Sequence, residues 1–321
     1  MRGKCLRVET IRDQTSHGKK AAYPVVAIGN FDGVHRGHQA ILKRTVEKAK
    51  ANKGTGIVLT FEPHPLKVLA PTQDLKFLMT FEERLRWIET IGIRQVRAVP
   101  FTRDFADLSP REFARKILCE DLGAKDVFVG DHFAFGKDRK GTVRDLQALG
   151  DELGFQVHAV EAVSVGGRPV SSSRIRECLM AGRVADAREL LGRDYSLEGR
   201  VIPGARRGRA LGYPTANFIP PAERVIPCNG IYAVRAELNG RVLNGASYIG
   251  TQPTLGPQER MVETHLFEPQ SDLYGRSIRV SFVEWIRPEQ TLKDKTELIR
   301  QVEEDIHKAK AILINDSREK G

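Results

Sequence analysis

Short apolar runs alternate with amphipathic stretches through the first half of the chain. Runs rich in β-branched residues predict five strands, at residues 25–28, 56–61, 95–101, 125–130 and 155–161. Between them, apolar side chains recur three and four positions apart after Gly37, and two further helices have capping signals at Thr80 and at Ser109. This alternation is typical of a doubly wound parallel sheet, so we expect an α/β domain that binds ligands beyond the carboxyl ends of its strands.

The pattern changes near residue 185. Two short helices are predicted at residues 172–181 and 185–191, and strand segments then follow closely at residues 197–202, 230–238, 242–250, 261–268 and 277–286. Short strands broken by Gly and Pro are typical of an antiparallel β-barrel or sandwich. An apolar stripe from Thr291 onward predicts one closing helix. We therefore expect domains at residues 1–184 and 185–315 and a frayed tail at 316–321.

Composition narrows the function classes. The 321 residues include 51 Lys and Arg against 41 Asp and Glu, a formal net charge of +10, and 40% are apolar. No apolar run approaches the roughly 18–20 residues that span a bilayer, and the first residues lack the apolar stretch of a signal peptide. The four cysteines stand far apart with no C-x-x-C pair, which disfavours a zinc site or a disulfide framework. These features favour a two-domain cytoplasmic protein.

The stretch GNFDGVHRGH, residues 29–38, directly follows the first predicted strand. Its three glycines let the backbone approach a ligand closely, and the helix that follows offers free N–H groups to a phosphate. His35 and His38, three residues apart, can donate hydrogen bonds to the same anion. A tight turn with surface histidines is the alternative, but the position and the density of small and polar residues favour a phosphate site.

His35, Gly37 and His38 resemble the H-x-G-H signature of nucleotidyltransferases, and the whole stretch resembles the amino-terminal half of the bifunctional bacterial riboflavin kinase/FMN adenylyltransferase family. Two later stretches, residues 129–141 and 171–179, resemble further motifs of this family, although His132 stands where many relatives have Asn or Asp. The resemblance implies that a phosphate oxygen of FMN attacks the α-phosphorus of ATP. It implies charge-stabilising roles for His35, His38 and Arg176, and binding roles for Gly29, Phe31, Asp32, Gly33, Gly37, His132, Phe133, Ser172 and Ser173.

A second glycine-rich stretch, residues 199–217, contains four arginines, three of them between residues 205 and 210, and ends in GYPTAN. Glycines between arginines suit a cationic flap over polyphosphate, and a solvated basic hairpin is the alternative. The stretch resembles the riboflavin kinase motif G-x-P-T-x-N, which implies that Thr215 and Asn217 bind the Mg²⁺ of Mg-ATP. It also implies binding roles for Gly199, Arg207, Arg209, Gly212 and Pro214.

VETHLFE, residues 262–268, resembles the strand that holds the catalytic glutamate of riboflavin kinases, which falls on Glu263. The implied role is a base that deprotonates the ribityl 5′-hydroxyl of riboflavin. Strand alternation alone places Glu263, His265 and Phe267 on one face, where a surface glutamate is the alternative. Arg287, in IRPEQ, is expected to help shape the flavin or nucleotide pocket.

The resemblance covers residues 20 to 313 and implies a nucleotidyltransferase domain of Rossmann-like fold followed by a kinase barrel with a carboxyl-terminal helix. The expected cofactor is Mg²⁺, and the expected small-molecule partners are riboflavin, FMN, FAD and ATP, with no nucleic acid and no membrane; a weak homo-oligomer is left open. Two rivals remain. The +10 charge fits a nucleic-acid binder, although aromatic-rich stacking motifs are missing from the sequence. A related nucleotidyltransferase with a regulatory carboxyl half is disfavoured by the presence of Thr215, Asn217 and Glu263.

Overall fold

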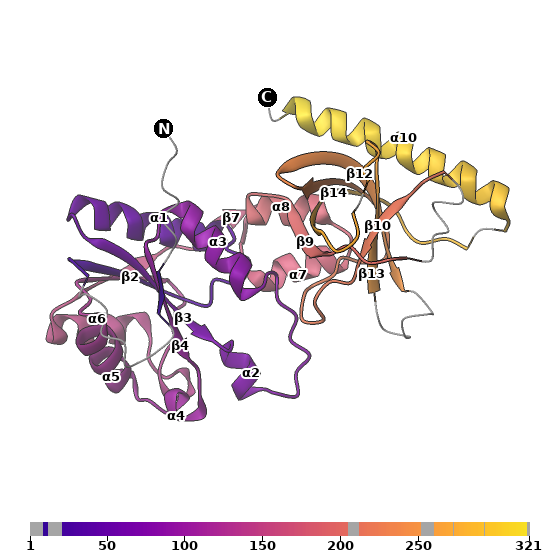
Figure 1. The fold of residues 1–321 in the computed structure, drawn as a ribbon. Helices are drawn as coiled ribbons and strands as arrows, with labels where there is room; N and C mark the ends of the chain where they lie inside the picture. The colour runs from indigo at the N-terminus through magenta and orange to yellow at the C-terminus, as the bar shows by residue number, and fades with distance from the viewer. Residues whose placement is uncertain are drawn as a thin grey trace. The chain divides into compact units, whose positions relative to one another are not determined.

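The computed structural model describes residues 9–11, 21–204, 212–251, 260–271, 273–291 and 293–319 (Figure 1). By packing, the chain divides into two compact units, residues 1–171 and 172–321. The division lies ahead of residue 185 because helix α7 (Ser172–Met180) packs on helix α8 (Val184–Leu191). Helix α8 in turn packs on strands β9 (Tyr195–Arg200) and β14 (Ser277–Arg287) of the second unit. The limits of the two functional domains stay a prediction.

The first unit is a parallel sheet with the strand order β1-β4-β3-β2-β5-β6. Its strands are β1 (Glu9–Ile11), β2 (Pro24–Ile28), β3 (Thr55–Glu62), β4 (Gln95–Pro100), β5 (Asp126–Gly130) and β6 (Gln156–Val160). The order reverses between β2 and β5, the place where sheets of this kind bind ligands beyond the strand ends. The doubly wound expectation is confirmed, and five of these strands lie within one residue of their predicted limits.

Helices cover both faces of this sheet, as Figure 1 shows. They are α1 (Arg36–Ala51), α2 (Pro65–Leu69), α3 (Phe81–Ile91), α4 (Arg103–Ala106), α5 (Pro110–Phe113), the π-helix η1 (Ala114–Asp121), the short 3₁₀-helix η2 (Lys137–Arg139) and α6 (Val143–Leu153). Along β2, Val25 and Ala27 pack with α1 and α3, whereas Val26 and Ile28 pack with α5, η1 and α6. Both predicted capping boxes, at Thr80 and Ser109, are present. A two-stranded hairpin, β7 (Ser164–Val165) and β8 (Arg168–Pro169), ends the unit.

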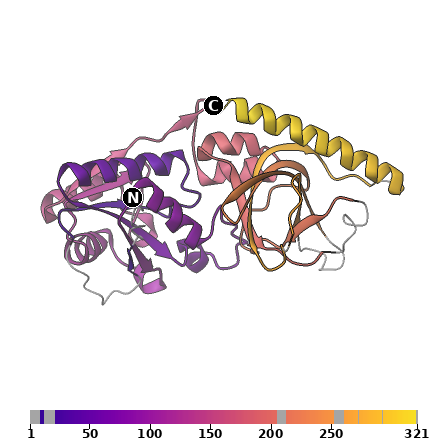
Figure 2. The same cartoon turned by 45° about the horizontal axis from the view of Figure 1, so that its top comes forward.

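The second unit is an antiparallel sheet with the strand order β10-β13-β12-β11-β14-β9. The remaining elements are α7 (Ser172–Met180), β10 (Thr215–Phe218), β11 (Gly230–Leu238), β12 (Arg241–Thr251), β13 (Arg260–Leu266) and α10 (Lys295–Glu319). The sheet curls, as Figure 2 shows, until its two edges meet at a bridge between Ile202 and Asn217. Helix α10 packs on it through Ala309 and Leu313, which confirms the predicted barrel and closing helix. Strand β10 was not among the predicted strands.

The predicted frayed tail at 316–321 is wrong for residues 316–319, because α10 continues through Glu319. Asp316 is buried, and its carboxylate lies 2.5 Å from the guanidinium of Arg188 and 2.6 Å from that of Arg235. The apolar stripe that guided the prediction stops at Leu313. The helical turn after Leu313 is attached by ion pairs instead, and a pattern of apolar residues does not predict ion pairs.

A buried acidic group lies at the amino end of β5. This is the edge of the sheet opposite the carboxyl ends of the strands. The Asp126 side chain is fully buried, accepts a 2.6 Å hydrogen bond from Nε2 of His158 and lies 3.2 Å from Nζ of Lys48. Burial alone raises the pKa of Asp126, but hydrogen bonds from His158, Tyr23 and Lys48 outweigh it and hold the pKa below its ordinary value. The ionised form is therefore the one that stabilises the fold.

We expect Asp126→Ala to lower the free energy of unfolding of the first unit by about 2 kcal/mol at neutral pH, because charged hydrogen bonds are lost. The folded pKa lies below the unfolded value of about 3.9, so the difference from wild type is present above about pH 4 and shrinks as the pH falls through the folded pKa. Urea unfolding as a function of pH measures this. Glu120→Gln, which breaks an exposed ion pair with Arg115, is the control and should change little. A difference independent of pH would contradict the assignment.

Candidate functional site

The loop after β2 contains the predicted histidine motif and lies where the strand order reverses. Its backbone takes left-handed conformations at Phe31 (φ 52°), Gly33 (φ 83°) and Val34 (φ 38°). A Cβ atom on Gly33 would lie 2.6 Å from Cδ1 of Leu78, closer than real Cβ contacts. Glycine suits this position because it adopts a left-handed φ angle at little cost and because an added Cβ would press on the side chain of Leu78.

Buried charged groups hold this loop in place. Asp32 is 5% exposed and accepts hydrogen bonds from the N–H of Leu78 at 3.0 and 3.2 Å. Arg84, on α3, is buried, donates to the carbonyl oxygen of Asn30 and lies 3.4 Å from Glu62. Burial lowers the pKa of Arg84, and the charges of Glu62 and Asp32 oppose this effect. The structure thus gives Asp32 a structural contact, and its predicted role in ligand binding stays a prediction.

The two histidines of the motif lie face to face at the start of α1. His35 is the N-cap residue, is 6% exposed, and accepts a 3.3 Å hydrogen bond at Nδ1 from the N–H of His38. The imidazole rings stack with centroids 3.6 Å apart, and Phe31 meets His38 edge-on at 5.3 Å. Because Nδ1 of His35 accepts, the proton of its neutral ring is on Nε2. Two imidazoles at the amino end of a 16-residue helix suit an anionic phosphate.

The predicted residues at the end of β5 lie in a turn. His132 is 91% exposed, with Nε2 4.0 Å from Asp131. Phe133 is half-buried, and its ring lies parallel to that of Phe135 with centroids 5.6 Å apart. Strands β2 and β5 are neighbours, so this turn and the histidine loop leave the same edge of the sheet from adjacent strands.

Ser172, Ser173 and Arg176 begin α7, which belongs to the second compact unit and is described with it. Ser173 is exposed, and Ser172 and Arg176 are half-buried. Of the residues predicted for the first site, the structure therefore brings together those of the histidine loop. It places Ser172, Ser173 and Arg176 at the start of a separate helix.

The register of four antiparallel strands assembles the second site. Cross-strand partners share a face of the sheet, and the pairing gives two adjacent rows. One row is Ile231, Tyr248, Glu263 and Asn217, and the next is Ala233, Ala246, His265 and Thr215. The predicted base Glu263 on β13 therefore lies directly opposite the predicted metal ligand Asn217 on β10. Thr215 lies two residues before Asn217 on β10.

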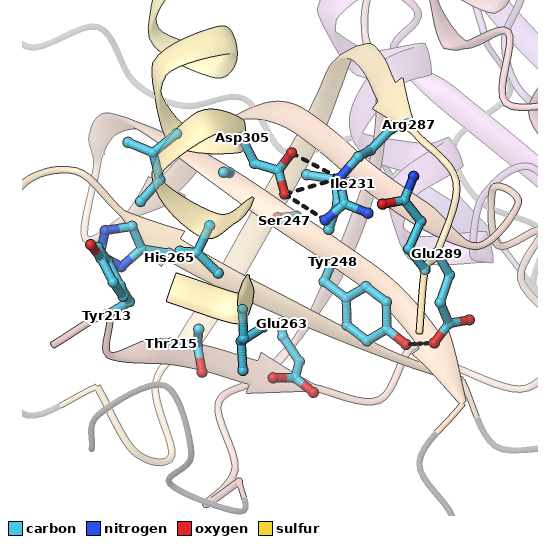
Figure 3. A pocket seen from close by; sticks show the side chains of 15 residues that line it. Tyr213, Thr215, Ile231, Ser247, Tyr248, Glu263, His265, Arg287, Glu289 and Asp305 are labelled. Atoms are coloured by element: carbon cyan, nitrogen blue, oxygen red, sulfur yellow. Dashed lines mark hydrogen bonds and ion pairs between the residues drawn. The ribbon is translucent and has the colours of Figure 1, made fainter. Parts of the chain in front are cut away.

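A cavity of about 470 Å³ opens over this face, with α10 as its other wall (Figure 3). Thr215 and Glu263 lie at one end, Tyr248 lies beside Glu263 on the neighbouring strand, and Glu289 and Arg287 lie toward the other end. Apolar side chains line it from both walls: Ile231 and Ala246 from the strands, and Leu298, Val302 and Ile306 from the helix. The cavity thus combines an apolar slot with a polar end.

Three polar residues of this cavity, Tyr248, Glu289 and Asp305, were not given a site role from the sequence, whereas Arg287 was expected to help shape the pocket. The hydroxyl of Tyr248 donates to Glu289, and burial, that hydrogen bond and the charge of Glu289 raise the pKa of Tyr248 well above its usual range. The guanidinium of Arg287 makes a bidentate pair with Asp305 on α10. No local motif predicts these two contacts, because the partners are 41 and 18 positions apart in the sequence.

The donor atoms near Glu263 suit a hard cation. Oδ1 of Asn217 is buried and accepts no hydrogen bond from any residue that the structure describes. Glu263 is the cross-strand partner of Asn217, and Thr215 is two residues before Asn217 on β10. Within the described ranges no group of three or more His, Cys, Asp or Glu side chains could hold a metal ion. Neutral oxygens fit Mg²⁺ when nucleotide phosphates complete its shell.

The other residues predicted for this site are less informative. Arg207 and Arg209 lie outside the described residues. Gly212 and Pro214 are exposed, and the carbonyl oxygen of Pro214 accepts a 3.0 Å hydrogen bond from Nδ1 of His265. A Cβ atom on Gly199 would lie 2.4 Å from Cδ2 of Phe218, so packing inside the barrel explains that glycine.

A doubly wound sheet with a histidine loop where its strand order reverses, followed by a barrel whose cavity is lined by Glu263, fits a two-domain transferase. Two family models match: one described as FAD synthetase over residues 18–174 and one described as riboflavin kinase over residues 191–313. The bifunctional riboflavin kinase/FMN adenylyltransferase of Escherichia coli K12 is 38% identical over 88% of this chain and 90% of its own length. That of Bacillus subtilis strain 168 is 36% identical over 91% and 93%. The chain belongs to the bifunctional riboflavin kinase/FMN adenylyltransferase family, which confirms the resemblance of its motifs.

A solved structure agrees with the fold. The crystal structure of a protein named as a macrolide-efflux protein from Streptococcus pneumoniae matches with a TM-score of 0.85 and 28% identity, over 93% of this chain and 97% of that one. The same two-unit architecture therefore occurs in an experimental structure. In the part of this chain that the structure describes, no helix is long and apolar enough to cross a membrane.

We expect Gly33→Ala to destabilise the first unit more than Gly154→Ala does, by about 1–2 kcal/mol. Gly154 has nearly the same φ angle, 84°, but no atom lies within 4 Å of an added Cβ, so it isolates the backbone strain. The difference measures the collision with Leu78. Urea unfolding of both variants tests it, and equal losses would show that Leu78 moves aside without cost.

Proposed function

We propose that the second unit phosphorylates riboflavin to FMN with Glu263 as its base, and that the first unit adenylylates FMN to FAD with His35 and His38 at the reacting phosphates. The single observation that supports this most strongly is the register that sets Glu263 opposite Asn217. It places a carboxylate and neutral oxygen donors on one face of the sheet, where Thr215 and Glu263 line a cavity with apolar walls. The family matches over both halves supply the two substrates.

The kinase reaction needs a base because its nucleophile is a hydroxyl. Glu263 accepts the proton of the ribityl 5′-hydroxyl as that oxygen attacks the γ-phosphorus of ATP, and ADP leaves. The apolar walls of the cavity exclude water from the flavin ring. Thr215 and Asn217 would hold Mg²⁺, and the bound ion would neutralise charge on the phosphates.

The adenylyl transfer needs no strong base because the phosphate of FMN is already ionised. An oxygen of that phosphate attacks the α-phosphorus of ATP, and pyrophosphate leaves. His35 and His38 stabilise the charge on the transferring group from the amino end of α1, and Arg176 adds a guanidinium. Because the side chain of His132 is exposed, we propose that it contacts only the phosphate of the substrate that lies furthest from the reacting centre.

The other expectations about partners and location form part of the proposal. We assign the chain to the cytoplasm, with small-molecule substrates and neither nucleic acid nor membrane as a partner. A part of the +10 charge is explained by cations that serve phosphates, such as Arg176. The rival in which the carboxyl half is only regulatory is disfavoured, because Thr215, Asn217 and Glu263 lie on one face of the sheet.

We expect Glu263→Gln to reduce FMN formation from riboflavin by about 10²- to 10⁴-fold, the usual contribution of a general base. Conversion of supplied FMN to FAD should be unchanged. His38→Ala is the reciprocal control: it should still form FMN but lose FAD formation. Chromatographic separation of the flavins over time measures both reactions. If Glu263→Gln forms FMN at the wild-type rate, Glu263 is not the base.

We expect Thr215→Val to raise the Mg²⁺ concentration for half-maximal FMN formation by at least about tenfold, because even residues outside the first ligand sphere cost that much. Valine keeps the shape of threonine and removes only its hydroxyl. Thr215→Ser, which keeps the hydroxyl, should resemble wild type. Titration of the kinase reaction with Mg²⁺ tests this, and an unchanged titration curve for Thr215→Val would remove Thr215 from the metal site.

A further inference from the structure

Helix α10 presents a narrow apolar stripe to the cavity of the second unit. Leu298, Val302 and Ile306 are four residues apart, so they follow one face of the helix, and all three line the cavity. Ile231 and Tyr248 line the opposite wall. The gap between these walls depends on how the helix is rotated about its own axis, because a rotation would replace the stripe by neighbouring polar side chains.

Two polar contacts fix α10 on either side of this stripe. Asp305 accepts hydrogen bonds from Arg287 at 2.9 Å from Nε and 2.7 Å from a terminal nitrogen, as Figure 3 shows. Glu303 accepts a 3.1 Å hydrogen bond from the hydroxyl of Tyr213. At about 100° per residue, Glu303 and Asp305 lie on opposite flanks of Val302. The helix is therefore held against rotation in both directions.

The pair of Arg287 and Asp305 is the stronger of these two contacts. Their side chains are 14% and 6% exposed, so both charges have been largely removed from water. Burial of two charges costs free energy that their attraction does not necessarily recover, and such a pair is a weak source of stability. What a bidentate guanidinium–carboxylate pair does supply is a defined orientation.

We propose that Arg287 is a positioning residue that, through Asp305, sets the rotation of α10 and so the width of the slot that accepts the flat flavin ring. This inference rests on the proposed kinase function of the second unit. Arg287 acts on ring binding and not on the reacting groups, which lie at the Thr215 and Glu263 end of the cavity.

The same helix provides a matched control for a purely structural role. Asp316 is a second buried carboxylate of α10, paired with Arg188 and Arg235. It lies eleven residues beyond Asp305, about 16 Å further along the helix, and does not line the cavity. Loss of this pair should weaken the attachment of α10 without changing the slot.

The test is the Kd of riboflavin for the full chain, measured by quenching of flavin fluorescence, together with kcat at saturating riboflavin. We expect Arg287→Met and Asp305→Asn each to raise the Kd by about tenfold, or about 1.4 kcal/mol. The double variant should also be about tenfold weaker, because the two residues act as one unit. All three should keep kcat within about threefold of wild type, and Asp316→Asn should lower the melting temperature but leave the Kd unchanged.

The possible failures are distinguishable. If wild type binds riboflavin and a folded Arg287→Met variant binds it equally well, the positioning role is wrong and the proposed function stands. If kcat falls and the Kd does not change, Arg287 acts on the reacting groups and the inference is also wrong. If wild type does not bind riboflavin, the proposed function fails first. Asp305→Asn, the milder change, gives the same answers if Arg287→Met does not fold.

Discussion

The pairing of β10 with β13 is the constraint on which the second site depends. It sets Asn217 opposite Glu263 and Thr215 opposite His265, and a slip of one residue would turn these side chains to the other face of the sheet. The pairing is fixed from both sides. Strand β13 also pairs with β12, and Asn217 itself bridges to Ile202, where the curled sheet meets its other edge. Closure of the barrel and assembly of the site are therefore the same event.

In the function that we propose, the two units handle phosphate by different physical means. In the first, a helix start and two stacked imidazoles are proposed to bind a phosphate that is already ionised, and a loop held by Asp32 and Arg84 sets their position. In the second, the nucleophile is a neutral hydroxyl, so a carboxylate and oxygen donors are gathered on a strand face beneath an apolar wall. The difference follows from the pKa of the group that attacks, and it explains why a histidine loop suits one reaction and a glutamate the other.

Local patterns predicted local structure well. The parallel strands and the buried stripe of α1, from Ile41 to Ala49, follow from periodicity, and both capping boxes follow from side chains three residues apart. The histidine loop was identifiable because all its residues are contiguous. Contacts across the fold were not predictable: Tyr248 with Glu289, Arg287 with Asp305, and Asp316 with Arg188 join residues far apart in sequence. Strand β10 was missed because it is only four residues long and follows directly on a glycine-rich stretch.

A time course of the wild-type chain with riboflavin, ATP and Mg²⁺, with the flavins separated at each point, tests the central claim most directly. The claim is that one chain holds both reactions, the first on the Glu263 face and the second at the histidine loop. It predicts that FMN accumulates first and that FAD then forms at its expense, with ADP released in the first step and pyrophosphate in the second. Folded protein that forms neither FMN nor FAD under these conditions would contradict it.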